Sequence, residues 1–173
     1  MGYTTDFWGR VELDHPLTDE HAAYLRAFNQ TRRMARREDL AVLYSDPIRE
    51  AVGLPVGPEG GYFVGGEGFM GQDGDNSVTS YNDPPAGQPG LWCQWVPSED
   101  GSAIEWDQGE KFYDYVAWMK YLINHFLKPW GYVANGEIQF QGEDEDDRGI
   151  LVVKDNRVGV SWATRVYGEV KFD

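Results

Sequence analysis

The side chains that most often carry out catalysis are few and scattered in this sequence. The three histidines, His15, His21 and His125, lie far apart, and none belongs to an H-E-x-x-H or H-x-H pattern that could hold a metal ion. The one cysteine, Cys93, lies among tryptophans in an expected strand, where a buried structural thiol is more common than a nucleophile. We therefore expect no catalytic residue, no metal site and no cofactor, and a small hydrolase is the last of our alternatives.

Two short patterns in the glycine-rich region resemble ligand-binding loops, but neither is complete. Residues 66–71 read G-x-G-x-x-G, which binds a dinucleotide only where it follows a strand and opens a helix, and no helix start follows here. Residues 73–77 begin like a calcium loop, but Val78 and Pro84 occupy the positions of the turn glycine and the bidentate glutamate. Asx turns explain the second pattern better.

A more specific candidate is the stretch from Gln72 to Trp95, where amide and aromatic side chains accompany a backbone rich in glycine and proline. Such groups suit a flat polar ligand, a base or a peptide. The competing interpretation is a structural lid, with one of the tryptophans in the core. The candidate ligand-binding residues are Gln72, Asp73, Tyr81, Asn82, Gln88, Trp92 and Trp95, with Gln94 beside them.

The charge of the chain favours a basic protein as the partner. It carries 29 acidic and 15 basic residues, for a net charge of −14, which repels phosphate backbones and anionic lipid. The acidic residues concentrate in the run 143–147, and five arginines lie between residues 26 and 37. Both clusters fit either a solvated surface or a bipolar binding surface. The candidate partner-binding residues are Glu143, Asp144, Glu145, Asp146 and Asp147.

Hydrophobic periodicity predicts the elements that must position these side chains. Long helices are expected over residues 19–37, with the arginines in the C-terminal half, and over 109–128, with a short helix over 46–52. The second long helix should bury Val116, Met119, Ile123 and Phe126 and expose Tyr113, Lys120 and Asn124. Strands are expected at residues 6–13, 62–64, 91–96, 103–106, 137–141, 149–154 and 158–164.

Residues 53–90 show almost no periodicity and hold 11 of the 21 glycines. We expect an ordered but irregular segment there, folded over the sheet. The element order predicts an α+β fold, with a mostly antiparallel sheet, two main helices packed on one face and this long irregular Gly/Pro-rich segment.

The length of 173 residues predicts a single domain. One cysteine allows no internal disulfide, so nothing indicates an oxidising compartment. The first residues do not resemble a signal peptide, and no apolar run approaches the ~20 residues that span a bilayer. We therefore expect a cytoplasmic protein without a membrane partner.

Several strings of residues resemble a family of uncharacterised proteins found in bacteriophages and bacteria. They are MGYTTDF at residues 1–7, GLWCQWVP at 90–97, GEKFY at 109–113, HFLKPWGY at 125–132 and QGED at 141–144. The resemblance runs through nearly the whole chain and implies a phage-associated setting, but it carries over no catalytic residue. The leading hypothesis is a non-enzymatic binding or inhibitory protein that acts on a host protein through its acidic surface. The alternative is a protein that binds or sequesters a small ligand, such as a nucleotide, through residues 66–95.

Overall fold

In the strands of the main sheet, buried and exposed side chains largely alternate, because successive side chains of a strand point to opposite faces. The computed structural model describes residues 2–66 and 75–173. Six strands form one sheet in the order β4-β5-β1-β6-β7-β8, and every neighbouring pair is antiparallel. The strands are β1 (Thr5–Leu13), β4 (Trp95–Pro97), β5 (Ala103–Trp106), β6 (Ala134–Gly142), β7 (Arg148–Lys154) and β8 (Arg157–Trp162).

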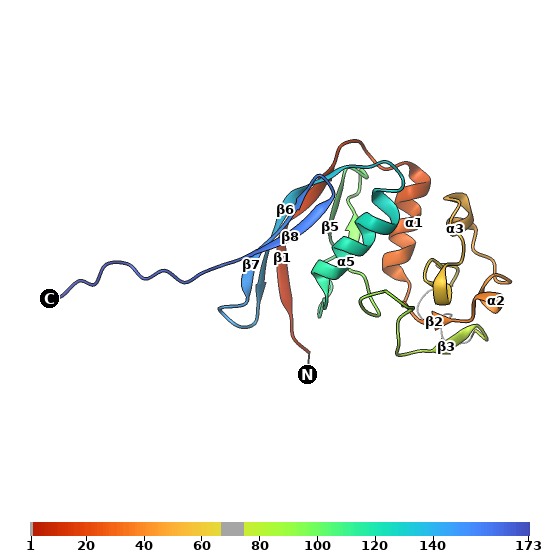
Figure 1. Cartoon of the computed structure of the whole chain (residues 1–173), viewed down its shortest axis with the longest axis horizontal. Coiled ribbons are helices and arrows are strands. Elements are labelled where there is room, and N and C mark those ends of the chain that lie inside the picture. Colours follow the sequence, from red (N-terminus) through yellow and green to blue (C-terminus); the bar gives the residue numbers. More distant parts are fainter. Residues whose placement is uncertain (1, 67–74) are drawn as a thin grey trace.

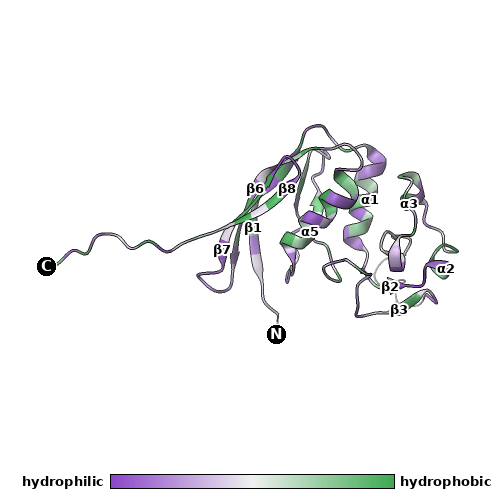
Figure 2. Ribbon diagram, viewed as in Figure 1, coloured by the Kyte–Doolittle hydropathy of each residue, from purple (hydrophilic) through white to green (hydrophobic). Residues whose placement is uncertain are grey.

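Two helices, α1 (Asp19–Gln30) and α5 (Tyr115–Leu122), pack on one face of this sheet (Figure 1). In Figure 2 hydrophobic and hydrophilic stretches alternate along α5, as expected of a helix with one face in the core. The sheet contributes Val11, Ile104 and Ile138 to that core, and the helices contribute Phe28, Met119 and Phe126. The predicted α+β fold, with a mostly antiparallel sheet and helices on one face, is confirmed.

The second long helix buries the face that its periodicity predicted. Met119, Ile123 and Phe126 are fully buried, and Val116 is half-buried against the same core. Tyr113, Lys120 and Asn124 are exposed, as expected.

The start of that helix was predicted wrongly, at residue 109. Helical backbone begins only at Tyr115, because Lys111 and Asp114 adopt left-handed conformations with φ of 58° and 56°. These turns let the buried Phe112 reach Phe7 and Trp95, with ring centroids 5.8 and 5.1 Å away. The helix then widens into a π-helical turn (Ile123–Leu127).

The first helix also ends earlier than predicted, at Gln30 rather than residue 37. Thr18 caps its start by accepting a hydrogen bond from the amide of His21 at 3.2 Å. At its end the Thr31 hydroxyl donates to the carbonyl of Ala27 at 2.7 Å. Of the five arginines expected in its C-terminal half, only Arg26 lies in the helix; the other four lie beyond it, and Arg33 and Arg36 are buried. These two instead form hydrogen bonds with the irregular segment.

The described parts of residues 35–90, which include the irregular segment, form a third layer outside the helices, on the side away from the sheet and not folded over it as expected (Figure 1). This layer contains a two-stranded sheet of β2 (Ala35–Arg36) and β3 (Val78–Ser80). The short helices α2 (Glu38–Ala41) and α3 (Pro47–Ala51) and a 3-10 turn (Pro58–Gly60) complete it. The predicted short helix over 46–52 is therefore confirmed as α3.

Two strand predictions in this part of the chain need correction. Residues 62–64 form no strand, because their backbone groups bond to side chains: Arg33 Nη2 donates to the carbonyl of Phe63 at 3.0 Å, and the amide of Val64 donates to Asp46 Oδ2 at 3.1 Å. The strand predicted over 91–96 is shorter and shifted, as β4, although its hairpin with β5 is present.

Candidate functional site

The sheet face that the helices leave bare carries a large exposed aromatic side chain, Trp8. Its indole is 55% exposed in the middle of β1, between the buried Phe7 and the exposed Arg10. Since side chains that are paired across neighbouring strands share a face, the register defines what surrounds Trp8. We call the outward-facing side chains of β1, β6, β7 and β8 the open face. They are Asp6, Trp8, Arg10, Glu12, Asn135, Glu137, Gln139, Gln141, Arg148, Ile150, Val152, Lys154, Arg157, Gly159 and Ser161.

An uncharged row crosses this face. Trp8 lies opposite Gln139, which lies opposite Ile150, which in turn lies opposite Ser161. The neighbouring row contains Gln141 and Arg148. Together these residues line a hollow of about 440 Å³. An indole, two primary amides and a guanidinium at one concavity offer a stacking surface with hydrogen-bond donors and acceptors beside it.

A second hollow, of about 570 Å³, lies on the other side of Trp8. Its lining includes Asp6 and Glu105, so this side offers carboxylates. Trp8 therefore separates a hollow that contains amides and Arg148 from a hollow that contains acidic residues. A tryptophan in such a position can act as an aromatic anchor if a partner covers it and excludes water.

The acidic run 143–147 forms the turn between β6 and β7, at the end of the open face where Asp6 lies, as the sequence predicted. We call residues 143–147 the acidic loop. Its backbone is held by the amide of Asp144, which donates to the Tyr3 hydroxyl at 3.2 Å, and by Gln141 Nε2, which donates to the carbonyl of Asp144 at 2.9 Å. Two of its carboxylates accept bonds from the N-terminal residues: Glu143 Oε1 from the amide of Thr4 at 2.7 Å, and Asp147 Oδ2 from the Tyr3 hydroxyl at 2.6 Å. Glu145 and Asp146 remain exposed and form ion pairs with Arg165. The loop thus presents carboxylates from a fixed backbone.

Tyr3 remains a hydrogen-bond donor at this loop. The amide of Asp144, which donates to the Tyr3 hydroxyl at 3.2 Å, lowers the pKa of that hydroxyl. The hydrogen bond to Asp147 and the nearby carboxylates outweigh this effect and leave the pKa above its ordinary value. The phenol is therefore protonated at neutral pH and can hold the loop.

The structure distributes the predicted ligand-binding residues over two environments. Tyr81 and Asn82 come together on the surface around Arg32, whose guanidinium lies 4.0 Å from the Tyr81 ring and donates to Asn82 Oδ1 at 3.2 Å. Gln88 and Trp95 are buried. Trp92 is half-buried, and Gln72 and Asp73 lie outside the described residues.

The polar groups of the two buried residues are used within the protein. Gln88 Nε2 donates to the carbonyl of Gly61 at 2.6 Å and to the Tyr121 hydroxyl at 2.9 Å. Trp95 Nε1 donates to the carbonyl of Tyr115 at 2.8 Å. Gln94, beside them, donates to the carbonyl of Glu110 at 2.8 Å. These three side chains hold the chain together, which is the role that the lid interpretation gives them.

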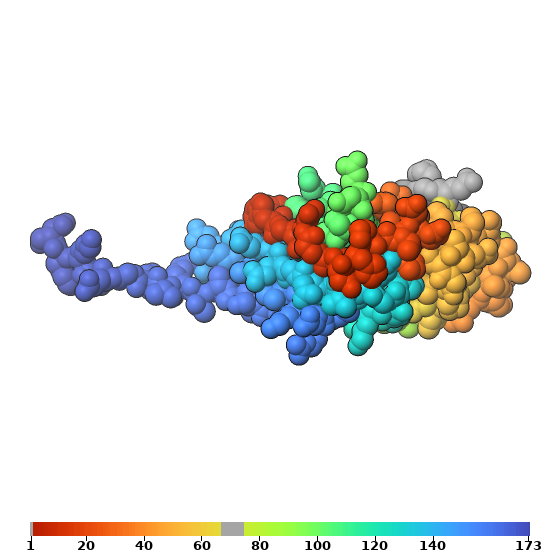
Figure 3. Space-filling view, turned by 90° about the horizontal axis from the view of Figure 1, so that it is seen from above, coloured from red at the N-terminus to blue at the C-terminus, as the bar shows by residue number. Residues whose placement is uncertain are grey.

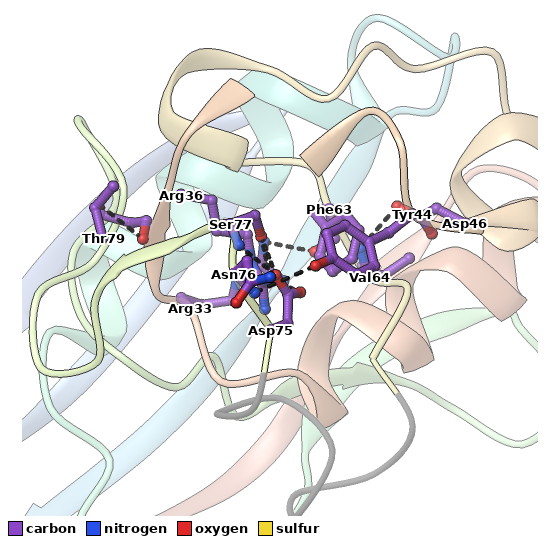
Figure 4. A network of polar contacts seen from close by, with 11 residues as sticks. Arg33, Arg36, Tyr44, Asp46, Phe63, Val64, Asp75, Asn76, Ser77 and Thr79 are labelled. Atoms are coloured by element: carbon purple, nitrogen blue, oxygen red, sulfur yellow. Dashed lines mark hydrogen bonds and ion pairs between the residues drawn. The ribbon is translucent and has the colours of Figure 1, made fainter. Parts of the chain in front are cut away.

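Two buried arginines, Arg33 and Arg36, organise the third layer (Figure 4). Arg33 donates to the carbonyls of Gly61 and Phe63, at 2.8 and 3.0 Å. Arg36 pairs with Asp75 and lies 4.3 Å from the centre of the Phe63 ring. Burial lowers the pKa of both guanidinium groups. The two cations fill the interior that apolar side chains would normally occupy.

The groups that could have supported catalysis lie in environments that favour their neutral forms. Burial raises the pKa of Cys93 to about 12, so this thiol is protonated. Burial also lowers the pKa of His21 and of His125. The ring Nδ1 of each histidine lies within hydrogen-bond distance of a tyrosine hydroxyl, 2.8 Å from Tyr132 and 2.9 Å from Tyr62. Within residues 2–66 and 75–173, no group of three His, Cys, Asp or Glu side chains could hold a metal ion.

Comparison with known proteins adds no relative. No protein-family model, no curated protein and no solved structure matches this chain. Across the described residues, no helix combines the length and the hydrophobicity needed to cross a membrane. Functional inference therefore depends on the open face and the acidic loop themselves.

One feature of the sequence, the position of Trp8, indicated the open face, although the amino-acid composition does not reveal it. Trp8 occupies an outward position of β1, between Asp6 and Arg10, where alternation predicts a polar side chain. The register across β6, β7 and β8 then brings Gln139, Gln141 and Arg148 beside it. That register depends on the hairpins and could not be read from any single strand.

Proposed function

We propose that this protein is a non-enzymatic binding protein that holds a partner protein with a basic surface against its open face and acidic loop. The observation that carries the proposal is Trp8, a large aromatic side chain more than half exposed at the centre of an uncovered sheet face. Tryptophan is enriched among the residues that dominate the binding energy of protein interfaces. It contributes most where the surrounding contacts exclude water. The hollows on both sides of Trp8 provide such surroundings.

Charge supports a basic partner. The open face itself carries acidic and basic residues in similar number, so its pairs largely balance. The acidic loop adds five carboxylates at one end, and the whole chain has a net charge of −14. Such a field accelerates association with a basic protein and slows association with nucleic acid. The resemblance to phage-associated proteins supports a host protein as the partner and inhibition as the outcome.

Capture of partners from host lysate, followed by affinity measurement, tests this proposal. Replacing Trp8 with alanine should weaken partner binding at least about tenfold, as expected of a central aromatic anchor. The melting temperature should change little, because much of the indole already contacts solvent. Leu43→Ala is the control, since Leu43 is also hydrophobic and is even more exposed, but lies in the third layer. A Trp8→Ala protein that keeps full affinity would refute the role of the open face.

The acidic loop is tested separately, through rates. Glu145→Lys combined with Asp146→Lys reverses two exposed charges without touching the residues that fix the loop, and should slow association more than it speeds dissociation. Raising the salt concentration should weaken the wild-type complex, because exposed charges are screened over about 8–10 Å. Asp39→Lys combined with Glu50→Lys makes the same charge change in the third layer and should have a smaller effect. If the two double variants slowed association equally, the net charge of the protein, and not the acidic loop, would be the cause of the slower association.

The hollow beside Trp8 supports a second candidate function, the binding of a small planar ligand. The Gln139 amide and Arg148 could hydrogen-bond the edge of such a ligand while the indole contacts its face, whereas Gln141 Nε2 already donates to the carbonyls of Gly142 and Asp144. Native mass spectrometry of the purified protein distinguishes this candidate, which requires a bound small molecule that is lost in a Gln139→Ala variant. The location differs from the stretch predicted from sequence, because Gln88 and Trp95 are engaged in the core.

A further inference from the structure

The last part of the chain leaves the body of the protein as an extended arm, which we define as residues 163–173. Figure 3 shows it as a narrow projection that stands clear of the rest of the molecule. Arg165 pairs with Asp146 at 2.6 Å, but residues 166–173 make no hydrogen bond, ion pair or ring contact with the rest of the described chain. The hydrophobic side chains of the arm, Val166, Tyr167, Val170 and Phe172, are between 71% and 91% exposed. A segment of this kind is normally covered by a partner.

The arm continues the side-chain pattern of β8 without a break. On the helix side of the sheet, β8 carries Val158, Val160 and Trp162, of which the first two pack against the core. The same even-numbered positions of the arm carry Val166, Val170 and Phe172, with Gly168 between them. The odd-numbered positions carry Arg165, Glu169 and Lys171, apart from Tyr167. Residues 157–172 thus have the alternation of one long strand, of which only the first part is paired.

β8 also has a free edge for such a strand. It is the last strand of its sheet, with β7 as its only neighbour in that sheet. The amide of Ala163 donates to the carbonyl of Arg148, at 3.0 Å, so odd-numbered residues bond towards β7. The backbone groups of even-numbered residues therefore point to the free edge. An exposed edge strand is a template for pairing with another chain.

We propose that two copies of this chain associate by antiparallel pairing of residues 157–172 across a two-fold axis, so that each arm lies on the free edge of the other copy's β8. Pairing through even-numbered residues places the hydrophobic side of each arm on the helix side of the joint sheet. With Val166 on the axis, Val170 lies opposite Trp162 of the other copy and Phe172 lies opposite Val160. In such an isologous contact both copies use the same surface, so the exposed hydrophobic side chains of both arms are covered and the free backbone groups of both β8 edges are paired.

Charge fits a second copy as the occupant, and it disfavours two of the neighbouring registers. With Val166 on the axis, Arg165 faces Tyr167, Glu169 faces Ala163 and Lys171 faces Ser161, so no like charges are opposed. Moving the axis to Arg165 would place two arginines opposite each other, and moving it to Thr164 would place Arg157 opposite Lys171. Like charges in directly opposed positions destabilise a sheet. The acidic and basic side chains of the arm balance, so two arms can approach in spite of the net charge of the chain.

The exposed aromatic area favours such a pair. Trp162, which is 57% exposed, and the arm residues Tyr167 and Phe172 give six aromatic side chains in two copies. An aromatic side chain removes about 150–250 Å² from water when it is fully buried, so the partly covered Trp162 adds less. Together with the aliphatic side chains and the paired backbone, these side chains bring the buried area towards the roughly 1,200–2,000 Å² of a standard interface. The inference does not depend on the partner proposed for the open face.

Sedimentation velocity of the full chain tests the association. The wild-type protein should be a dimer that dissociates on dilution, and Val170→Asp should convert it to a monomer with an unchanged melting temperature, because the arm lies outside the core. Lys171→Asp is the matched control: it alters the net charge more, yet its side chain faces the other way, so the dimer should persist. A monomeric wild-type protein, or a dimer that survives Val170→Asp, overturns the proposal. Equal dissociation of both variants also overturns it, since charge alone would then explain the loss.

A single introduced cysteine tests the register. Opposed residues in a hydrogen-bonded antiparallel pair have Cα atoms about 5.5 Å apart, which lies within the range of a disulfide. Val166→Cys should therefore form an intermolecular disulfide readily in a glutathione buffer, because the residue faces its own copy. Gly168→Cys, which faces Thr164, should not. The native Cys93 is buried and does not interfere. Equal cross-linking at both positions would refute the two-fold register.

Discussion

Arg33 shows how far a single polar residue can determine local structure in this protein. Its guanidinium is buried against the ring of Phe28, at 4.1 Å, and it bonds to three acceptors from residues 61–88. One of its nitrogens, Nη1, has no hydrogen-bond partner within the described structure. Sequence reasoning placed this residue in the C-terminal half of a helix, on either a solvated or a binding surface, and arginine is in general rarely buried. The unmet hydrogen-bonding of a glycine-rich backbone is the physical reason for the exception.

Replacing Arg33 with methionine should therefore destabilise the protein strongly. The change keeps much of the packing but leaves the carbonyl of Phe63 and the amide oxygen of Gln88 without a donor, whereas the carbonyl of Gly61 keeps its hydrogen bond from Gln88 Nε2. Each buried acceptor left unsatisfied costs about 1–3 kcal/mol, so we expect a loss of at least about 2 kcal/mol in the free energy of unfolding. Arg37→Met, at an exposed position, should change it by no more than about 0.5 kcal/mol. Urea denaturation measures both, and similar values for the two would contradict the role of Arg33.

At the scale of elements, the sequence predicted what depends on neighbours along the chain. The fold class, the hairpins and the buried face of the second helix follow from alternation, turn residues and helical spacing. The limits of both long helices were wrong, because tertiary contacts decided them: Phe112 is drawn into the aromatic core, and Arg33 into the third layer. The open face was missed because it exists only once the register of the β hairpins is known.

The turn between β7 and β8 shows the same competition between local and tertiary preference. Asp155 and Asn156 both have positive φ, 49° and 64°, as a two-residue type I′ hairpin requires. Local preference alone predicts that glycine would improve either position. Asn156, however, also accepts a hydrogen bond from the amide of Ala134 at 2.7 Å and donates to the carbonyl of Tyr132 at 2.9 Å.

Glycine substitutions should therefore have opposite effects at these adjacent positions. Asp155→Gly relieves a strained backbone without losing any of these bonds, and should leave stability unchanged or raise it by up to about 1 kcal/mol. Asn156→Gly removes two tertiary hydrogen bonds and should lower the free energy of unfolding by about 1–3 kcal/mol. Thermal unfolding of the two variants provides the comparison. A gain in stability at both positions would mean that the turn is governed by local conformation alone.

The whole molecule consists of layers with unequal cores. Most buried hydrophobic residues belong to one cluster between the sheet and the two main helices. The third layer has a small cluster of its own, Ala41, Val56 and Phe63, and depends otherwise on buried arginines and their hydrogen bonds. Apolar burial supplies most of the stability of a fold, whereas hydrogen bonds contribute less on balance. The outer layer should therefore open without unfolding the sheet, while the open face stays fixed for binding.

Hydrogen exchange measured by mass spectrometry should reveal this hierarchy. Amides of β1 and β6 should exchange only through global unfolding, whereas amides in residues 35–64 should exchange through a smaller opening. Arg36→Met removes the pairing with Asp75 and the bond to the Ser77 hydroxyl, at 2.8 Å, and should accelerate exchange in residues 35–64 at least tenfold while leaving β1 and β6 nearly unchanged. Arg37→Met is again the control and should alter neither region. If Arg36→Met accelerated exchange equally in the sheet and the outer layer, the molecule would unfold as one unit, and the sheet could not provide a rigid surface while its outer layer opens.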